Sequence, residues 1–114
     1  MGTKSGELIG IELAADLKAF GKLEDVIHVK GRLAIVSLLA ATESLAFTEL
    51  RDALRLTDGN LAAHLHALER AGYARLRKLA RPVKPVTMIS LTTAGRHAFS
   101  RYLEGLEHIV RRHR

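Results

Sequence analysis

The chain has 114 residues, and its 18 Lys and Arg outnumber its 12 Asp and Glu, for a formal net charge of +6 at pH 7. We expect one domain with a core of its own and no separate ligand-binding domain. The sequence has no cysteine, which excludes disulfides and thiolate metal sites, and no apolar run of roughly 18 residues that would cross a membrane. It also begins without a signal-peptide pattern, so we expect a soluble, cytoplasmic protein.

The N-terminal segment, residues 1–24, has the spacing of an amphipathic helix. Leu13, Leu17 and Phe20 fit one helical face, although Gly10 weakens the pattern. We expect this segment to be a helical extension that takes part in dimerisation.

Two further helices are predicted next. Residues 32–41 are nearly all apolar, which favours a buried helix at the centre of the core. Residues 47–54 form an amphipathic pattern of about two turns with Phe47, Leu50 and Leu54 facing inward. Only three residues separate Leu54 from the next predicted helix, and a short turn between two short helices is the helix-turn-helix spacing.

The segment 58–70 has the pattern of a short capped helix with a narrow apolar stripe. Thr57 is a good N-cap, because its hydroxyl oxygen accepts a hydrogen bond from a first-turn N–H, and Asp58 places negative charge where the helix dipole favours it. Gly72 follows where a helix end often needs a positive φ. The inward stripe consists of Leu61, Leu65 and Leu68.

The outward face of this helix mixes small residues with hydrogen-bonding ones. Asn bonds adenine edges, His and Arg bond base edges or phosphates, and alanine permits close approach, so the face suits the major groove of DNA. An ordinary amphipathic surface helix is the alternative. The outward and flanking residues are Asn60, Ala63, His64, His66, Ala67 and Arg70.

A basic β-hairpin is predicted after this helix. Residues 73–78 and 86–91 have the composition of strands, and residues 79–85 between them contain both prolines of the chain, which mark a turn or extended tip. Residues 1–71 carry eight Lys and Arg against ten Asp and Glu, whereas residues 72–114 carry ten against two. Such a basic strip is expected of a phosphate-contacting surface, although a merely solvated hairpin has the same composition.

Residues 93–114 predict a final helix. Its apolar stripe is too long for so small a domain to cover, so we expect both terminal helices to pack in a two-fold dimer that places two copies of helix 58–70 roughly 34 Å apart. The alternative is that both stripes fold back on their own core. The predicted stripe of this helix is Phe99, Tyr102, Leu103, Leu106, Ile109 and Val110.

Several short motifs occur in a familiar order. They are Phe-Thr-Glu-Leu at 47–50, Leu-Thr-Asp-Gly-Asn-Leu at 56–61, Ala-Gly-Tyr at 71–73 and Leu-Thr-Thr-Ala-Gly-Arg at 91–96. With the basic hairpin, this order resembles the winged helix-turn-helix transcriptional regulators, and among them the small MarR/ArsR-like group, over residues 25–103.

The resemblance implies a division of roles on DNA. The helix at 58–70 would enter the major groove with base contacts from Asn60, Ala63 and His64, and with Thr57 and His66 as neighbouring contacts. Backbone or minor-groove contacts would come from the wing residues Arg77, Lys78, Arg81 and Lys84. The lack of cysteine departs from many ArsR-type metal sensors, which use cysteine ligands.

Catalytic and metal-binding patterns are not found in the sequence. It has no Gly-rich phosphate loop, Gly-x-Ser-x-Gly or His-Glu-x-x-His motif, so we expect neither an enzyme nor a cofactor. His64 and His66 are two positions apart, about 200° around a helix, and do not readily share a metal ion. A His/Asp/Glu site between subunits stays open as a weaker alternative.

The sequence therefore predicts a mainly α fold with a small β-hairpin: a winged helix-turn-helix with terminal helices for dimerisation. We expect residues 1–24 to be the N-terminal extension, 25–92 the DNA-binding domain and 93–114 the C-terminal helix. The predicted function is a sequence-specific, double-stranded DNA-binding transcriptional regulator, acting as a homodimeric repressor. A winged-helix protein-interaction module is the alternative, and a small-molecule switch at the dimer interface is a third possibility.

Overall fold

The computed structural model describes the backbone of residues 2–23, 25–28 and 31–114, and the side chains of residues 10–21, 26–27 and 31–114. The fold is mainly helical with a three-stranded antiparallel sheet, which confirms the predicted fold class. In chain order the elements are α1 (Gly2–Leu23), α2 (Asp25–His28), α3 (Arg32–Ala40), β1 (Leu45–Ala46), α4 (Phe47–Leu54), α5 (Asp58–Arg70), β2 (Ala74–Leu79), β3 (Val86–Leu91) and α6 (Thr93–Arg112).

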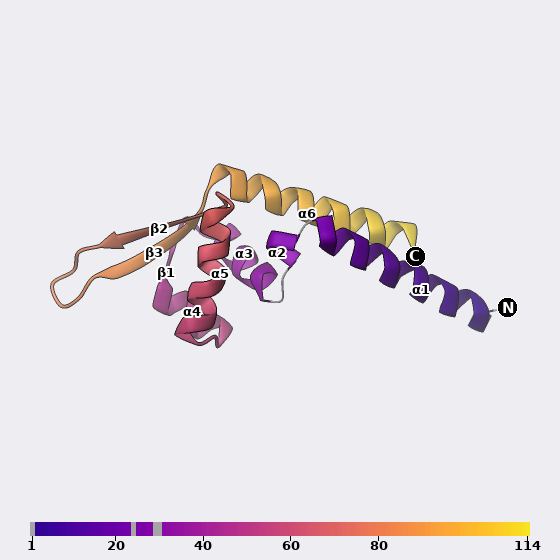
Figure 1. Cartoon of the computed structure of the whole chain (residues 1–114), viewed down its shortest axis with the longest axis horizontal. Helices are drawn as coiled ribbons and strands as arrows, with labels where there is room; N and C mark the ends of the chain where they lie inside the picture. The colour runs from indigo at the N-terminus through magenta and orange to yellow at the C-terminus, as the bar shows by residue number, and fades with distance from the viewer. Residues whose placement is uncertain (1, 24, 29–30) are drawn as a thin grey trace.

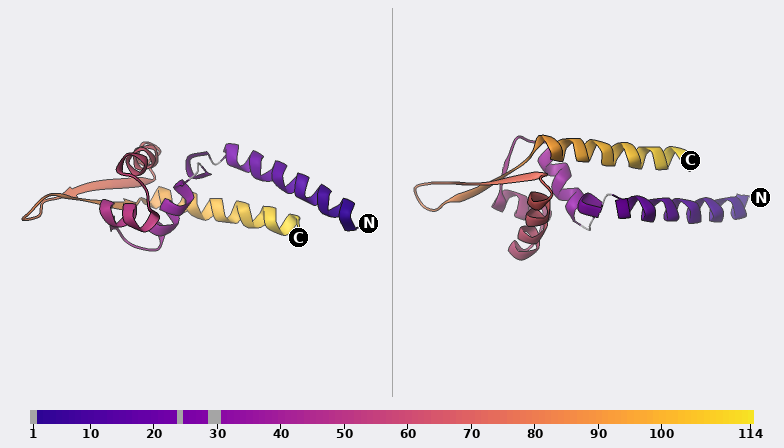
Figure 2. Two further views of the ribbon diagram at one scale, coloured as in Figure 1. Left: turned by 90° about the horizontal axis from the view of Figure 1, so that it is seen from below. Right: turned by 45° about the horizontal axis from the view of Figure 1, so that its top comes forward.

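The molecule consists of a head and an arm. The head comprises residues 31–92, and the arm comprises α1 and α6, which run antiparallel and carry both chain ends to their far end (Figure 1). The hairpin of β2 and β3 extends from the opposite side of the head, and the other two views show the same arrangement (Figure 2). The molecule therefore measures 67 × 26 × 21 Å, and its radius of gyration of 17.4 Å exceeds the roughly 13 Å of a compact chain this long.

The head has a closed apolar core. The inward leucines of α5, namely Leu61, Leu65 and Leu68, are all 0% exposed, as the helical spacing predicted. They pack with Ile35 and Leu39 of α3, Leu50 of α4 and Ile89 of β3. Predicted helices 47–54 and 58–70 match α4 and α5 at both ends, and the predicted helix 32–41 is one residue longer than α3.

The sheet is larger than the predicted hairpin. Its strand order is β1-β3-β2, and β1 pairs antiparallel with β3 through Leu45 and Ile89. A strand of only two residues has no periodicity, so the sequence did not predict it. In the hairpin, Ala74 lies opposite Leu91 and Lys78 opposite Thr87.

The hairpin is fastened at its base by Thr92. The Thr92 hydroxyl donates to the carbonyl oxygen of Gly72 at 2.6 Å and accepts the backbone N–H of Gly95 at 3.0 Å, so one side chain joins the end of α5 to the start of α6. The Thr92 N–H donates to the Tyr73 carbonyl oxygen at 3.0 Å. A Cβ atom at Gly95 would clash with that same carbonyl oxygen. Both ends of the hairpin are therefore held together at this junction.

The arm is held together within the chain. The rings of Phe20 and Tyr102 pack at a centroid distance of 5.0 Å, and a Cβ atom at Gly105 would clash with the Phe20 ring. Near the C-terminus, the His113 Nε2 atom lies 2.7 Å from Asp16 Oδ2. The hydrogen bond with His113 and the nearby charge of Arg112 lower the pKa of Asp16.

These contacts use part of the stripe predicted for dimerisation. Tyr102 is buried within the chain at 2% exposure, and Phe99 packs against the head core. Folding back within one chain, the alternative to pairing between subunits, thus accounts for part of the stripe. Leu103 and Val110 stay exposed at 47% and 51%, and Ile11 of α1 at 67%. The half-buried members of the predicted set are Leu13, Leu17, Phe20, Phe99, Leu106 and Ile109.

Candidate nucleic-acid interface

The exposed face of α5 carries most of the predicted base-contacting residues. Asn60, Ala63 and His66 are exposed at successive intervals of three residues, opposite the buried leucines. Thr57 is exposed too, and its hydroxyl oxygen accepts the backbone N–H of Asn60 at 3.1 Å, as the predicted N-cap requires. The Asn60 side chain is left on the surface at the first turn, where a helix approaching a groove presents its residues.

His64 is placed differently from these four residues. It is half-buried, and its Nδ1 atom accepts a hydrogen bond from Arg32 Nε at 3.3 Å. Burial first, and the charge of Arg32 second, lower the pKa of His64, which favours the neutral ring that this hydrogen bond requires. The ring is therefore turned toward the start of α3 and is not on the exposed face.

The turn between α4 and α5 places a further cation, Arg55, on the surface beside α5, and the sequence pattern did not predict it. Arg55 is exposed and has a φ of 54°, in the left-handed region, at the C-cap of α4. By contrast, Arg51 donates to Asp52 at 2.9 Å and to Asp58 at 3.0 Å, and these hydrogen bonds raise the pKa of Arg51 further above its ordinary value. The Arg51 charge is thus partly compensated, whereas Arg55 faces solvent.

The wing cations divide between two faces of the hairpin. Side chains alternate along a strand, so Arg77 and Lys78 point to opposite sides. Lys78 lines a cavity beside α5, whereas Arg77 lines a second one on the outer face of the sheet with Glu43 and Met88. Arg81 and Lys84 are exposed at the tip, and Lys84 lines a further cavity with Phe47 and Thr48 of α4. The sequence pattern did not separate these two sets, because it did not show on which side α5 lies.

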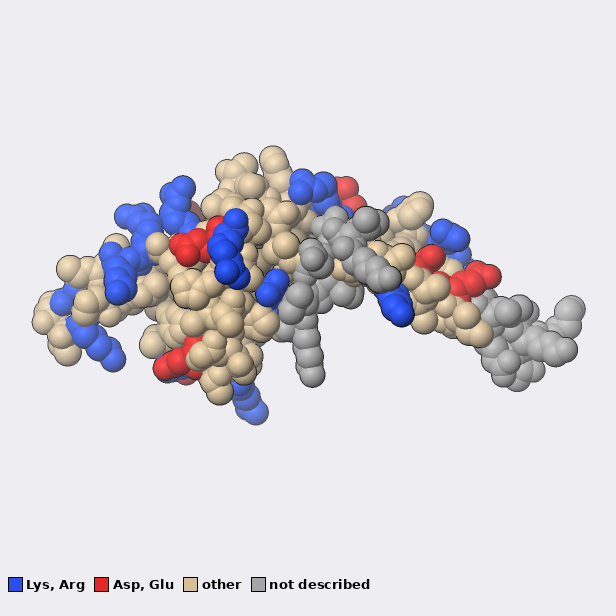
Figure 3. Space-filling view, viewed as in Figure 1, with Lys and Arg blue, Asp and Glu red and all other residues tan. Residues whose placement is uncertain are grey.

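The positive charge of residues 72–114 is not one continuous strip. The Arg96 guanidinium donates to the carbonyl oxygens of Ala40 at 3.2 Å and Thr42 at 3.0 Å, and so caps the C-terminal end of α3. Arg111 and Arg112 lie at the far end of the arm, beside Glu107 and Asp16. Lys and Arg side chains cluster along the wing in Figure 3. The wing lies within a stretch, residues 70–103, that contains no Asp or Glu.

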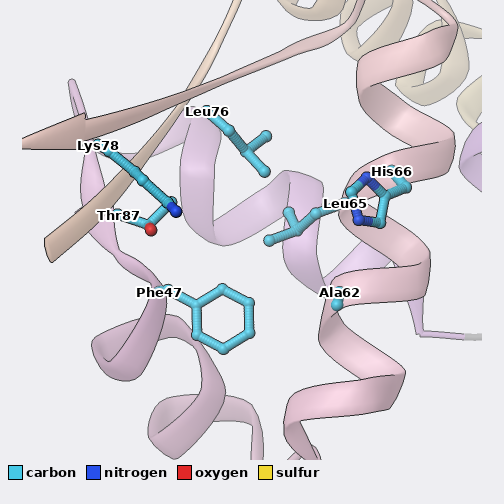
Figure 4. Close-up of a pocket in the computed structure, with 7 residues that line it drawn as sticks. All are labelled: Phe47, Ala62, Leu65, His66, Leu76, Lys78 and Thr87. Atoms are coloured by element: carbon cyan, nitrogen blue, oxygen red, sulfur yellow. The ribbon is translucent and has the colours of Figure 1, made fainter. Parts of the chain in front are cut away.

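A cavity of about 300 Å³ separates α5 from the wing (Figure 4). The side chains of Phe47, Leu65 and Leu76 point toward one another across it. Lys78 and Thr87, which are cross-strand partners, line it from the hairpin. Ala62 and His66 complete its lining from α5. The recognition face and the basic hairpin thus flank an apolar groove with a cation at its rim.

Neither a metal site nor a membrane span is found in the part of the chain that the structure describes. Within it, no three His, Cys, Asp or Glu side chains come together in a way that would hold a metal ion. None of its helices combines the length and apolarity needed to cross a membrane.

A helix-turn-helix whose second helix exposes a polar face beside a basic β-hairpin defines the winged helix class. The chain matches the winged helix DNA-binding domain over residues 32–110 and belongs to that family. This is a non-enzymatic, DNA-binding fold of transcriptional regulators. MarR-family regulators are among the proteins of similar structure, as the sequence motifs predicted.

Individual proteins resemble this chain in sequence or in fold. The chain is 39% identical over 72 residues to an uncharacterized protein of Methanocaldococcus jannaschii, covering 63% of this chain and 78% of that one. A transcriptional regulator homologue from Pyrococcus horikoshii OT3 is 28% identical, with a TM-score of 0.76 over 84% of this chain and 94% of the other. The fold is also that of Staphylococcus aureus MepR, solved in complex with DNA, at 18% identity and a TM-score of 0.75 over 90% and 82% of the chains.

Proposed function

We propose that this winged helix protein is a sequence-specific regulator of transcription that acts as a homodimeric repressor in the cytoplasm. The observation that carries the proposal is the exposed polar face of α5 beside a basic wing without carboxylates. A repressor of this kind would exclude polymerase by occupying a pseudo-palindromic operator.

In the proposed complex, α5 lies in the major groove. Asn60 and His66 offer hydrogen bonds to base edges, while Ala63 permits close approach and Thr57 contacts the neighbouring backbone or base. We leave His64 out of this set, because its Nδ1 atom is engaged by Arg32. Specificity thus comes from a short stretch of one helix.

Most of the affinity would come from the wing. Lys78 would face the DNA strand that passes between α5 and the hairpin. Arg81 and Lys84 would reach phosphates or the minor groove from the tip. Arg77 would contribute from the outer face. Arg55 in the helix-turn-helix turn is an additional phosphate contact that the structure suggests.

The arm is the proposed dimer interface, with residues 25–92 as the DNA-binding domain between the terminal segments 1–24 and 93–114. Its exposed Leu103 and Val110, seven residues apart on α6, support pairing with a second copy. Two-fold pairing would place two α5 helices roughly 34 Å apart, one turn of DNA. A small-molecule effector would bind at this interface.

The first test is fluorescence anisotropy with a mixed-sequence DNA duplex at roughly 50 to 200 mM salt. Release of counterions predicts a linear fall of log affinity with log salt, with a slope near −0.9 for each phosphate contact. Arg81→Ala should flatten the slope by about one contact, whereas Arg111→Ala, a matched loss of charge at the arm end, should not. Binding that is absent or insensitive to salt would reject the proposal.

The division of roles is tested on duplexes selected from a random library. Asn60→Ala should relax sequence preference and leave binding to mixed-sequence DNA nearly unchanged. Arg81→Ala should weaken binding to the selected duplex and to mixed-sequence DNA equally. Equal losses from both substitutions would contradict the assigned roles.

A protein-interaction module is the second candidate function. The apolar cavity lined by Phe47, Leu65 and Leu76 favours it, because such a cavity suits an apolar side chain of a partner. Salt distinguishes the two functions, since a protein partner does not require the steep dependence produced by counterion release.

A further inference from the structure

Besides the apolar core, an arginine at the start of α3 connects that helix to the recognition helix α5. The Arg32 guanidinium donates through Nη1 to the carbonyl oxygen of Val26 at 3.0 Å and through Nε to His64 Nδ1 at 3.3 Å. It therefore bridges α2 and α5, and its partner on α5 lies 32 residues further along the chain.

The backbone beside Arg32 is shaped to receive the His64 ring. Gly31 has a φ of +93°, a conformation that side chains other than glycine rarely adopt. A Cβ atom at this position would lie 3.1 Å from His64 Nε2, closer than an ordinary contact. The imidazole thus packs against a glycine on one side and accepts a hydrogen bond from Arg32 at its other nitrogen.

The same corner is continuous with the arm. Ile27, next to Val26, is 1% exposed and packs in one cluster with Ala98 and Tyr102 of α6. Phe20 of α1 packs against that cluster. Contacts therefore run from the arm through α2 and Arg32 to a single side chain on α5.

We propose that Arg32 is a positioning residue for the recognition helix, which it fixes through His64 at the angle to the arm that DNA recognition requires. This inference rests on the proposed function, because its consequence is the presentation of Asn60 and His66 to DNA. His64 itself then acts by orienting α5 and does not contact a base.

The contact is tested first without DNA, by NMR titration of the His64 ring. Arg32 faces the ring from α3, and the α5 neighbours one turn away, Asn60 and Leu68, are uncharged. Arg32→Met keeps the apolar stem but removes the donors and the charge, so the pKa of His64 should rise. Arg101→Met, a matched change at an exposed arginine of α6, should leave it unchanged. An unchanged pKa of His64 in Arg32→Met would overturn the proposal.

Binding to a duplex selected by the wild-type protein then tests positioning. Arg32→Met and His64→Leu should each weaken binding about tenfold, and the double variant should be no worse than either, because both break one interaction. His64→Asn, whose carbonyl oxygen replaces the Nδ1 acceptor, should retain most of the affinity. Binding to mixed-sequence DNA, which depends on the wing, should change less than twofold.

Several results would contradict this role. If His64→Leu relaxes preference at one base pair while Arg32→Met does not, His64 contacts a base. Additive losses in the double variant would show that the two residues act separately. If the wild-type protein binds no duplex, the proposed function fails and the positioning role fails with it, and the NMR titration then shows only whether Arg32 contacts the His64 ring. If the wild-type protein binds but neither variant weakens binding, the positioning role alone fails.

Discussion

The head and the arm both contain helices with apolar faces, yet they differ in how completely they bury those faces. Leu61, Leu65 and Leu68 of α5 are wholly buried, because α3, α4 and the sheet surround them. In the arm, two helices pack only against each other beyond the head, and Leu103 and Val110 of α6 stay half-exposed. The head buries its apolar faces within one chain, whereas the arm leaves apolar surface exposed.

The first prediction concerns the two kinds of leucine. Leu65→Ala should lower the free energy of unfolding by about 2–5 kcal/mol, because it leaves a cavity in a closed core. Leu103→Ala should cost less than about 1 kcal/mol at a protein concentration that favours the monomer, measured by urea unfolding. If the arm pairs with a second copy, the cost of Leu103→Ala should grow with protein concentration. Equal costs at every concentration would remove the distinction between head and arm.

A second prediction tests the contact inside the arm. Gly105→Ala should push α1 away from α6, because the new methyl group meets the Phe20 ring, with a cost of about 1–3 kcal/mol. Gly10→Ala is the control: among the described residues, no atom beyond its chain neighbours and the nearby helix backbone lies within 4 Å of its Cβ position, and alanine in a helix should stabilise by about 0.5–1 kcal/mol. Thermal unfolding measures both effects, and the same sign for the two would contradict the packing described for α1.

The junction between head and arm provides a third prediction. Thr92→Ala removes the N-cap of α6 and the hydrogen bond to Gly72, so unfolding should become easier by about 1 kcal/mol. The neighbouring substitution Thr93→Ala, at an exposed position, should change stability by less than about 0.5 kcal/mol. Chemical denaturation compares the pair, and indistinguishable midpoints would show that Thr92 does not fasten the junction.

The smallest expected effect is on the pH dependence of the arm. The hydrogen bond from His113 lowers the pKa of Asp16 in the folded state below its ordinary value of 3.8. This contact therefore stabilises the fold fully above pH 3.8, and the stabilisation is lost as pH falls through the lowered pKa. Asp16→Asn should flatten the acid side of the stability curve. The control is Asp52→Asn in the head, which should leave the α1–α6 contact unchanged. NMR spectra of the two variants across the same pH range make the comparison.

Much of the head was predictable because its periodicity is local. The leucine spacing, the Thr57 cap and Gly72 together fixed the bounds of α5, and the prolines marked the tip of the wing. The two-residue strand β1 was not predictable, because it exists only by pairing with β3. The place of His64 was missed for a similar reason: its partner, Arg32, is 32 residues away and looked like the start of an apolar helix.

The arm shows a second limit of sequence patterns. A stripe such as Phe99 to Val110 records that a face is apolar but not which surface covers it. Tyr102 is covered by α1 of the same chain, whereas Leu103, one residue further on, is not. The same limit applies to charge, because Arg96 and Lys78 contribute equally to the net charge of their segment but only Lys78 lies on the wing.

The fastening at Thr92 has a consequence for the evolution and engineering of the wing. Gly72, Tyr73 and Thr92 close the base of the hairpin, and Ile89 ties β3 to β1 and to the core, so the exposed tip, residues 80–85, is the part of the hairpin that is free to vary. Its length and charge can vary without shifting the register of α6 relative to α5. Changes of sequence at the tip can therefore be made while the rest of the molecule keeps its geometry.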